Sequence, residues 1–218
     1  MALARALSAD VGLILFDEPL SNLDADRREQ LRIEIATLTR ESGATAVYIT
    51  HDQSEAFALA DRVGVLRSGQ LVQFGTPEEI YQRPADAFVA HFTGVSGEFA
   101  VERFTRQTEE LVEVTLPFAP EHRIVASVPQ PLADGAPASL FVRAAGVALS
   151  EQAGEDGLHG TVLDAAFTGR GYEHVVELAP RMTLTKVFSE RRFERGTAVG
   201  LTLDPRSCFL MLNENERN

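Results

Sequence analysis

Lysine is nearly absent from this sequence of 218 residues. Lys186 is the only lysine among 20 basic residues, and the others are arginines. It stands between Thr185 and Val187, with no glycine-rich stretch before it. A phosphate-binding loop of the form G-x-x-x-x-G-K needs a lysine directly after its last glycine. The 218 residues therefore contain no such loop.

Other scarce features exclude further classes of protein. Cys208 is the only cysteine, so it cannot form an internal disulfide; it suits a reducing compartment and is expected to be a small apolar residue of a terminal strand. No apolar run approaches the roughly 18 residues of a membrane-spanning helix. The N-terminus lacks the basic start of a secretory signal. With 32 acidic residues and a net charge of −12, a protein that follows nucleic-acid phosphates is disfavoured.

The first 93 residues alternate between strand and helix patterns. The run Val11 to Phe16 is almost entirely apolar, which predicts a strand buried on both faces, and Ala44 to Thr50 predicts a second buried strand. Between them, Asp24 to Glu41 has apolar residues at helical spacing. A strand, a helix and another strand in this order predict a parallel sheet of the α/β class.

Three local signals continue this half. The segment Asp52 to Glu55 is similar to a capping box and predicts a helix through Ala60. The pair Ser68-Gly69 lies between two apolar runs and predicts a hairpin. The segment Thr76 to Glu79 combines an N-cap, a proline and acidic residues, so we expect a helix that ends before Pro84.

The residues from about 98 to 218 are typical of an all-β domain. Short segments with β-branched residues recur about every ten residues, as in a small barrel. We expect strands at 111–116, 123–128, 139–142, 161–165, 174–178, 183–188 and 199–203. The segment 93–97 is the expected linker, which divides the chain into domains at 1–93 and 98–218.

Two adjacent carboxylates follow the first predicted strand. Asp17 and Glu18 come directly after four apolar residues, at the edge where open α/β sheets bind ligands. Because neighbouring residues of a strand point to opposite faces, the two are expected to do different work. One carboxylate can face a metal held against phosphates while the other faces an attacking water. Taken alone, the pair could also begin a solvated turn.

The following motifs decide between these interpretations. The sequence continues with Ser21-Asn22-Leu23-Asp24, and the second strand ends in Thr50-His51-Asp52. With these spacings, residues 1–94 resemble the C-terminal half of an ABC transporter nucleotide-binding subunit. LILFDEP is similar to the Walker B motif, SNLD to the D-loop and YITHD to the switch-histidine loop. MALARAL resembles the helix that follows the family's signature sequence.

The resemblance implies a role for each matching residue. Asp17 would hold Mg2+ through its water shell, and Glu18 would act as general base or polarise the attacking water. His51 would contact the γ-phosphate of ATP. Ser21 and Asp24 would lie at the interface between two nucleotide-binding subunits. Without the resemblance, His51 would be interpreted as a histidine of an ordinary loop.

The resemblance also points to missing parts. The family's Walker A loop, Q-loop and signature sequence are not in these 218 residues, so we expect a truncated or partial subunit. Alone, such a chain is expected to bind Mg-ATP weakly and to hydrolyse it negligibly, and to be poorly soluble because apolar sheet surface is left uncovered.

The second half resembles the OB-like domain appended to importer ATPases for sugars, ferric iron, polyamines and oxyanions. Residues 141–143, 160–163, 167–172 and 203–208 carry this resemblance, although Ala144-Ala145 replaces the usual Pro-Glu after Arg143. The overall sequence is most similar to ferric-iron importers, with polyamine and sugar importers close behind.

These expectations define a leading hypothesis and its competitors. The leading one is an ATP-binding, ATP-hydrolysing subunit at the cytoplasmic face of the membrane. It would form a homodimer and act with permease subunits and, indirectly, with a solute-binding protein, without contacting nucleic acid. The alternatives are a non-catalytic dimerisation or regulatory module of a transporter and an unrelated P-loop ATPase; the D-loop and histidine spacing argues against the last.

Overall fold

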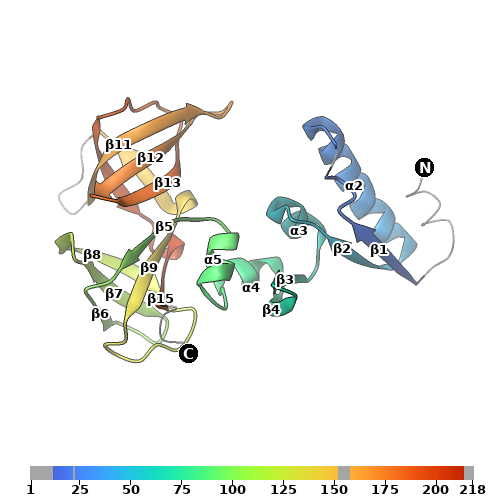
Figure 1. Ribbon diagram of the computed structural model, residues 1–218, viewed down its shortest axis with the longest axis horizontal. Coiled ribbons are helices and arrows are strands. Elements are labelled where there is room, and N and C mark those ends of the chain that lie inside the picture. The colour runs from blue at the N-terminus through green and yellow to red at the C-terminus, as the bar shows by residue number, and fades with distance from the viewer. Residues whose placement is uncertain (1–11, 22, 152–157, 214–218) are drawn as a thin grey trace. The chain divides into compact units, whose positions relative to one another are not determined.

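The computed structural model describes residues 12–21, 23–151 and 158–213. The chain forms two compact units, Met1–Tyr81 and Gln82–Asn218, and each is described by itself (Figure 1). The MALARAL segment and Asn22 of the SNLD motif lie outside the described residues. Among the described residues, no helix has the length and hydropathy needed to cross a bilayer.

The first unit is built on a parallel pair of strands, as the sequence predicts. Strand β1 (Leu13–Asp17) pairs with β2 (Thr45–Ile49), in a register that runs from Leu13 opposite Thr45 to Asp17 opposite Ile49. Helix α2 (Ala25–Ser42) connects them. It begins at its N-cap Asp24 and ends at Gly43, whose φ of 65° is the left-handed conformation that favours glycine at this place.

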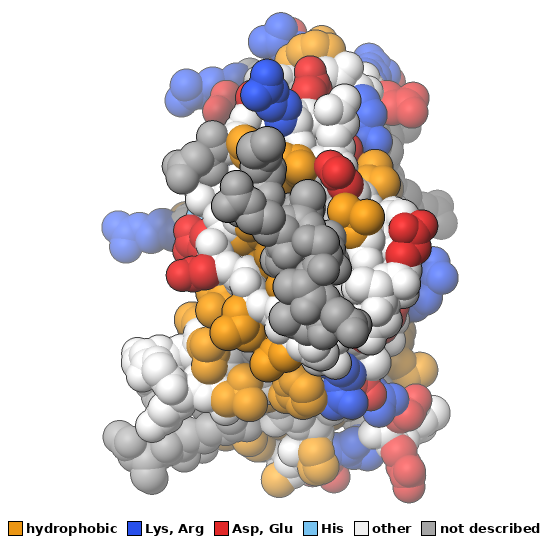
Figure 2. All heavy atoms as spheres, turned by 90° about the vertical axis from the view of Figure 1, so that its right-hand side faces the viewer, with side chains coloured by type: hydrophobic (Ala, Val, Ile, Leu, Met, Phe, Trp, Pro, Cys, Tyr) orange, Lys and Arg blue, Asp and Glu red, His pale blue; other side chains and the backbone are white. Residues whose placement is uncertain are grey.

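The prediction that both strands are buried on both faces was wrong. Ile14 and Phe16 are buried in a cluster with Leu20 and Ile35, whereas the alternate side chains of β1 are exposed. The exposed apolar face, as we call it, consists of Leu13, Leu15, Val47 and Ile49, with exposed fractions of 46% to 72%. Figure 2 faces the β1 and α2 side of this unit and shows hydrophobic side chains at the surface. One helix on a two-stranded sheet covers only one face, so the side chains that alternate to the other face meet solvent.

The rest of the first unit follows its local signals closely. Helix α3 (Gln53–Leu59) starts after its N-cap Asp52. Strands β3 (Val63–Arg67) and β4 (Gln70–Gly75) form the predicted hairpin. Its turn residues Ser68 and Gly69 both have positive φ, as the tightest hairpin turns require.

Helix α4 (Pro77–Gln82) begins with a complete capping box. The backbone N–H of Thr76 donates to the Glu79 carboxylate at 2.9 Å, and the N–H of Glu79 donates to the Thr76 hydroxyl at 3.2 Å. The predicted start of this helix, and its end before Pro84, are both confirmed.

The second unit is mostly β structure, as expected. A six-stranded sheet has the order β5-β9-β15-β8-β7-β6, and a five-stranded sheet has the order β10-β14-β11-β12-β13. The bounds of the strands are β5 (Val95–Ala100), β6 (Arg103–Arg106), β7 (Leu111–Leu116), β8 (Ala119–Ser127), β9 (Ala138–Arg143), β10 (Val147–Ser150), β11 (Leu158–Phe167), β12 (Tyr172–Ala179), β13 (Met182–Ser189), β14 (Ala198–Leu203) and β15 (Cys208–Leu212). The sequence did not predict β5, β6 or β10, whereas β15 is the terminal strand expected to contain Cys208.

The five-stranded sheet curls into a barrel-like form. Its edge strands β10 and β13 lie against each other, and β12 and β13 carry irregularities of register that let the sheet bend. A five-stranded, partly open barrel is the arrangement of OB-like domains, which confirms the predicted class. His174 of β12 is completely buried inside it; its ring contacts the Val187 carbonyl and accepts a hydrogen bond from the N–H of Phe193 at 3.1 Å.

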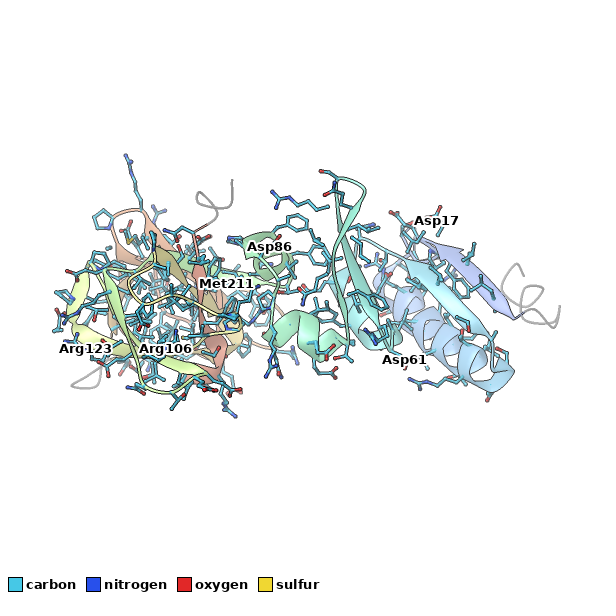
Figure 3. The ribbon with its side chains drawn as sticks, turned by 90° about the horizontal axis from the view of Figure 1, so that it is seen from below. Asp17, Asp61, Asp86, Arg106, Arg123 and Met211 are labelled. Atoms are coloured by element: carbon cyan, nitrogen blue, oxygen red, sulfur yellow. The ribbon has the colours of Figure 1, made fainter. Side chains whose placement is uncertain are left out.

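The compact units divide earlier than the domain boundary expected from the sequence. Helix α5 (Ala87–Phe92), capped by Asp86, belongs to the second unit (Figure 3). Its residue Ala90 packs in a buried cluster with Phe141, Phe209 and Met211 of β9 and β15. Residues 95–97 are part of β5 and not a linker. Apolar burial against the second unit's own sheet therefore overrides the loop-like composition of this stretch.

Candidate functional site

Asp17 ends β1 at the carboxyl edge of the parallel pair. It is exposed, and it stands opposite Ile49, the last residue of β2 (Figure 3). The two strand ends therefore lie side by side, and the residues that follow them in sequence start from the same edge. This is the edge of an α/β sheet where ligands bind.

Glu18 leaves the strand in an unusual backbone conformation. Its φ is 43°, in the left-handed region that residues other than glycine seldom adopt. Its N–H donates to the carbonyl of Ile49 at 2.9 Å, which ties the turn after β1 to the end of β2. Strand alternation therefore does not set the direction of Glu18, and that part of the sequence argument was wrong. The left-handed turn decides its direction instead.

The carboxylate of Glu18 and the imidazole of His51 are brought together. Glu18 Oε1 lies 3.4 Å from His51 Nδ1, and the side chains are 46% and 73% exposed. The two residues are 33 positions apart in the sequence, and the parallel pairing of β1 with β2 makes them neighbours. An exposed carboxylate beside an imidazole can accept a proton from a water molecule that lies near both side chains, or transfer that proton onward.

The two predicted interface residues each make a local hydrogen bond, Ser21 to the turn at Glu18 and Asp24 to the start of α2. The hydroxyl of Ser21 donates to the carbonyl of Glu18 at 3.0 Å. Asp24 accepts the N–H of Arg27 at 3.0 Å as the cap of α2, and its other oxygen lies 3.6 Å from the Arg27 guanidinium. Both side chains are exposed, so each has a structural task in the described chain and remains accessible.

A buried polar network behind His51 was not foreseen from the sequence. The capping box expected at Asp52 is only half formed: Asp52 caps α3, but Glu55 turns inward and is 4% exposed. Its carboxylate accepts hydrogen bonds from the hydroxyls of Tyr48 at 3.1 Å and Thr50 at 2.8 Å. The signal that could have revealed this is the presence of two hydroxyl residues just before the capping motif.

Electrostatic shifts mark the same segment. Hydrogen bonds from the Ser54 hydroxyl and from the backbone N–H groups of Ser54 and Glu55 lower the pKa of Asp52, with a smaller contribution from Arg28. Burial, followed by the negative charge of Glu55, raises the pKa of Tyr48. Tyr48 therefore stays protonated and acts as a hydrogen-bond donor to Glu55.

The residues at this strand edge suit a magnesium ion only if phosphates of a bound ligand also coordinate it. In the ranges that the structure describes, no three His, Cys, Asp or Glu side chains gather into a metal site. Asp17 is a single exposed carboxylate at the strand edge. Mg2+ typically keeps several waters and binds through one or two carboxylates plus substrate phosphates, so a lone aspartate suits that mode and not a permanent metal centre.

Comparison with curated proteins gives the same assignment as the motifs. The Fe(3+) ions import ATP-binding protein FbpC of Rhizobium etli is 41% identical over 178 residues, covering 81% of this chain and 48% of the relative. The corresponding protein of Brucella melitensis is 40% identical over 177 residues, with the same coverage. Over the part that it covers, this chain is similar to the ATP-binding subunits of ABC importers. The sn-glycerol-3-phosphate import ATP-binding protein UgpC of Jannaschia sp. is 57% identical over 94 residues, covering 43% of this chain and 27% of the relative.

The second unit also matches a known domain, and the matched relatives are longer than this chain. Residues 140–211 match the model of the TOBE domain, which spans β10 to β14 and most of β9 and β15. The chain spans about half the length of the importer subunits FbpC that it matches. Among solved structures, the cytoplasmic molybdate-binding protein ModG covers 54% of this chain and 94% of its own, with 17% identity and a TM-score of 0.43, which is too distant to carry an argument.

Proposed function

We propose that this chain carries the hydrolytic residues of an importer's ATP-binding subunit. The observation that carries the proposal is the approach of Glu18 to His51, at 3.4 Å, on the carboxyl edge of the parallel strands. Glu18 acts as general base or polarises the attacking water, and His51 orients that water and contacts the γ-phosphate. Transfer of a phosphoryl group to water depends mainly on positioning and charge stabilisation, which two such side chains can provide.

Asp17 is the magnesium-side residue of the proposal. Its carboxylate would hold Mg2+ through waters, and the ion would supply positive charge beside the ATP phosphates. Ser21 and Asp24 face the second nucleotide-binding subunit of a homodimer, and the hydrogen bond from Ser21 to the Glu18 carbonyl links that interface to the general base.

The transported solute is proposed as ferric iron. Several of the relatives that match most of this chain are named as Fe(3+) import proteins, and this supports iron. A relative named for sn-glycerol-3-phosphate import matches 94 residues of the chain with higher identity, so solutes other than iron compete, among them the polyamines and sugars that the sequence resemblance leaves open. The subunit acts at the cytoplasmic face of the membrane with permease subunits, and indirectly with a solute-binding protein.

The TOBE domain has a regulatory or dimerising role in this proposal. The second unit has a buried core of its own, shared by its two sheets, which supports a unit that can act apart from the hydrolytic edge. If that were the only task of the chain, the protein would be a non-catalytic module of a transporter. The two possibilities differ in whether Glu18 and His51 matter for ATP hydrolysis.

A chimera tests the hydrolytic role directly. The upstream half of the Rhizobium etli relative, joined to this chain at the matching position, gives a full-length subunit whose ATP hydrolysis can be measured as phosphate release. Glu18→Gln and His51→Ala are each expected to lower kcat on the order of a hundredfold to a thousandfold. Glu34→Gln, an exposed glutamate of α2, is the matched control and should leave kcat unchanged.

Binding measurements make the outcome decisive. Fluorescent ATP analogues should bind the chimera and its Glu18→Gln variant alike, because the substitution leaves the phosphate-binding half intact. A chimera that binds and hydrolyses ATP but is indifferent to Glu18→Gln and His51→Ala would overturn the proposal and favour the non-catalytic module.

A further inference from the structure

The carboxylate of Glu55 is buried, which is rare in folded proteins. Its side chain is 4% exposed, and a buried carboxylate is costly unless hydrogen bonds satisfy it. Two donors do so at the same oxygen, Oε2: the Tyr48 hydroxyl at 3.1 Å and the Thr50 hydroxyl at 2.8 Å. Tyr48 lies in β2 and Thr50 follows the strand directly, so the carboxylate joins α3 to the segment that leads into His51.

The hydroxyl of Thr50 passes this connection on to the backbone. Because it donates its proton to Glu55, its oxygen is free to accept, and it accepts the N–H of Asp52 at 2.9 Å. Asp52 is held on its other side as well, since its carboxylate caps α3 through the N–H groups of Ser54 and Glu55. The residues before and after His51 are therefore both fixed by side-chain hydrogen bonds.

His51 itself has little burial to fix it. Its side chain is 73% exposed, and its contact with Glu18 Oε1, at 3.4 Å, is longer than a good hydrogen bond. The direction of the imidazole therefore depends on the backbone at residues 50–52. That backbone depends on Thr50, and Thr50 depends on Glu55.

We propose that Glu55 is a positioning residue for His51, and that its buried carboxylate acts through Thr50 to hold the imidazole toward Glu18. The inference rests on the proposed function for its consequence in hydrolysis, but the positioning itself is a property of the chain without ATP. The polarity of the network supports it, because the raised pKa of Tyr48 keeps that hydroxyl a donor. The pKa of Arg32 in α2 is raised chiefly by its hydrogen bond to Glu29, and the negative charge of Glu55 contributes to the same shift.

The test uses the full 218-residue chain with isotope-labelled histidine. NMR gives the ring nitrogen shifts of His51, assigned by the loss of signal in His51→Gln, and hydrogen exchange gives the protection of the Asp52 amide. Glu55→Gln keeps an oxygen that can accept both hydroxyls, so the His51 signals should stay in place. Glu55→Leu keeps the volume and removes the acceptor, so the ring nitrogen shifts should move toward those of free imidazole. Exchange at Asp52 should then rise on the order of tenfold or more.

Thr50 gives a second pair that does not disturb the buried charge. Thr50→Val keeps the shape and should reproduce the effect of Glu55→Leu, whereas Thr50→Ser keeps the hydroxyl and should restore the wild-type shifts. Glu34→Leu, at an exposed position of α2, is the matched control for replacing glutamate by leucine. If Glu55→Leu fails to fold by circular dichroism, the Thr50 pair alone decides.

The results separate a positioning role from a merely structural one. A structural role would lower the stability of Glu55→Leu without moving the His51 signals in folded Thr50→Val, and that result would overturn the inference. In the chimera, Thr50→Val should lower kcat on the order of tenfold to a hundredfold while KM for ATP changes little. If Glu18→Gln leaves hydrolysis unchanged there, the proposed function fails while the NMR result still judges the positioning of His51.

Discussion

The backbone N–H of Glu18 donates a hydrogen bond to the carbonyl of Ile49 at 2.9 Å. This bond extends the pairing of β1 with β2 by one residue beyond Asp17, into the left-handed turn at Glu18. It places the carboxylate of the turn beside the loop that carries His51. The proposed chemistry of this chain therefore depends on the register of two short strands.

The lone cysteine is expected to be inert in the folded protein. Cys208 in β15 is completely buried, and burial, with a smaller effect of Asp204, raises the pKa of its thiol to about 12. At pH 8 only about one thiol in ten thousand would be ionised, so a disulfide reagent such as DTNB should react with the native chain extremely slowly. In urea, the absorbance of the DTNB product should rise in step with the unfolding of the second unit. Rapid reaction without denaturant would contradict the buried placement.

Arg143 is expected to be a stabilising residue of the second unit. Its side chain is 3% exposed, it donates to the carbonyl of Thr93 at 2.9 Å and to the Thr93 hydroxyl at 3.2 Å, and it lies over the ring of Phe209. Arg143→Met keeps much of the apolar stem but leaves the Thr93 carbonyl without this donor. The free energy of unfolding should fall by about 2–3 kcal/mol. Urea denaturation measures this, with exposed Arg103→Met as a control that should change stability little.

Ser54 is expected to tune the acid stability of α3. The pKa of Asp52 is lowered chiefly by the Ser54 hydroxyl, which donates to it at 2.6 Å. A lowered pKa in the folded state means that the cap stabilises above the ordinary value of 3.8 and that this contribution is lost as the pH falls through the lowered pKa. Ser54→Ala should raise the pKa of Asp52 toward 3.8 and move the loss of helix signal to higher pH. An NMR titration of the Asp52 carboxyl carbon would show no change if the hydroxyl has no such effect.

The exposed apolar face is expected to make the isolated chain associate. Leu15 is 72% exposed and Val47 is 46% exposed, and the two are directly paired across the adjacent strands β1 and β2. The double variant Leu15→Thr with Val47→Thr keeps β propensity and should lower the apparent mass in light scattering toward that of a monomer. Phe167→Thr removes a similarly exposed apolar side chain from the second unit and serves as the control. Wild-type chain that is monomeric at the same concentration would show that the prediction is wrong.

The isolated 218-residue chain is expected to bind Mg-ATP weakly. It contains one lysine, and no G-x-x-x-x-G-K loop that could surround the phosphates with backbone N–H groups. Isothermal titration should give a dissociation constant well above the micromolar range. Micromolar affinity would mean that residues outside the recognised motifs bind Mg-ATP together with Asp17 and His51.

Local sequence signals predicted the elements whose structure is decided within a few residues. The hairpin turn at Ser68-Gly69 and the capping box at Thr76 and Glu79 are both confirmed, because backbone conformation and near-neighbour hydrogen bonds determine them. The α/β class and the family resemblance were also readable, since strand-end carboxylates and motif spacing lie within the chain's linear order.

Other features depended on what each segment packs against. The sequence predicted that Leu13 and Leu15 are buried, but burial depends on neighbouring elements, and only one face of β1 is covered. The stretch 93–97 looked like a linker, but it joins helix α5 to strand β5 within the second unit, and residues 95–97 are part of β5.

The sequence by itself determined which chemical groups are available: Asp17 and Glu18 after a strand, His51 after the next, and no phosphate-loop lysine. Only the tertiary structure decided how they meet. The left-handed turn and the β1–β2 register bring Glu18 to His51, and the burial of Glu55 redirects a capping residue toward Tyr48 and Thr50. Hydrogen bonds between residues distant in sequence have no signature in the linear order, because they form only when the strands are already side by side.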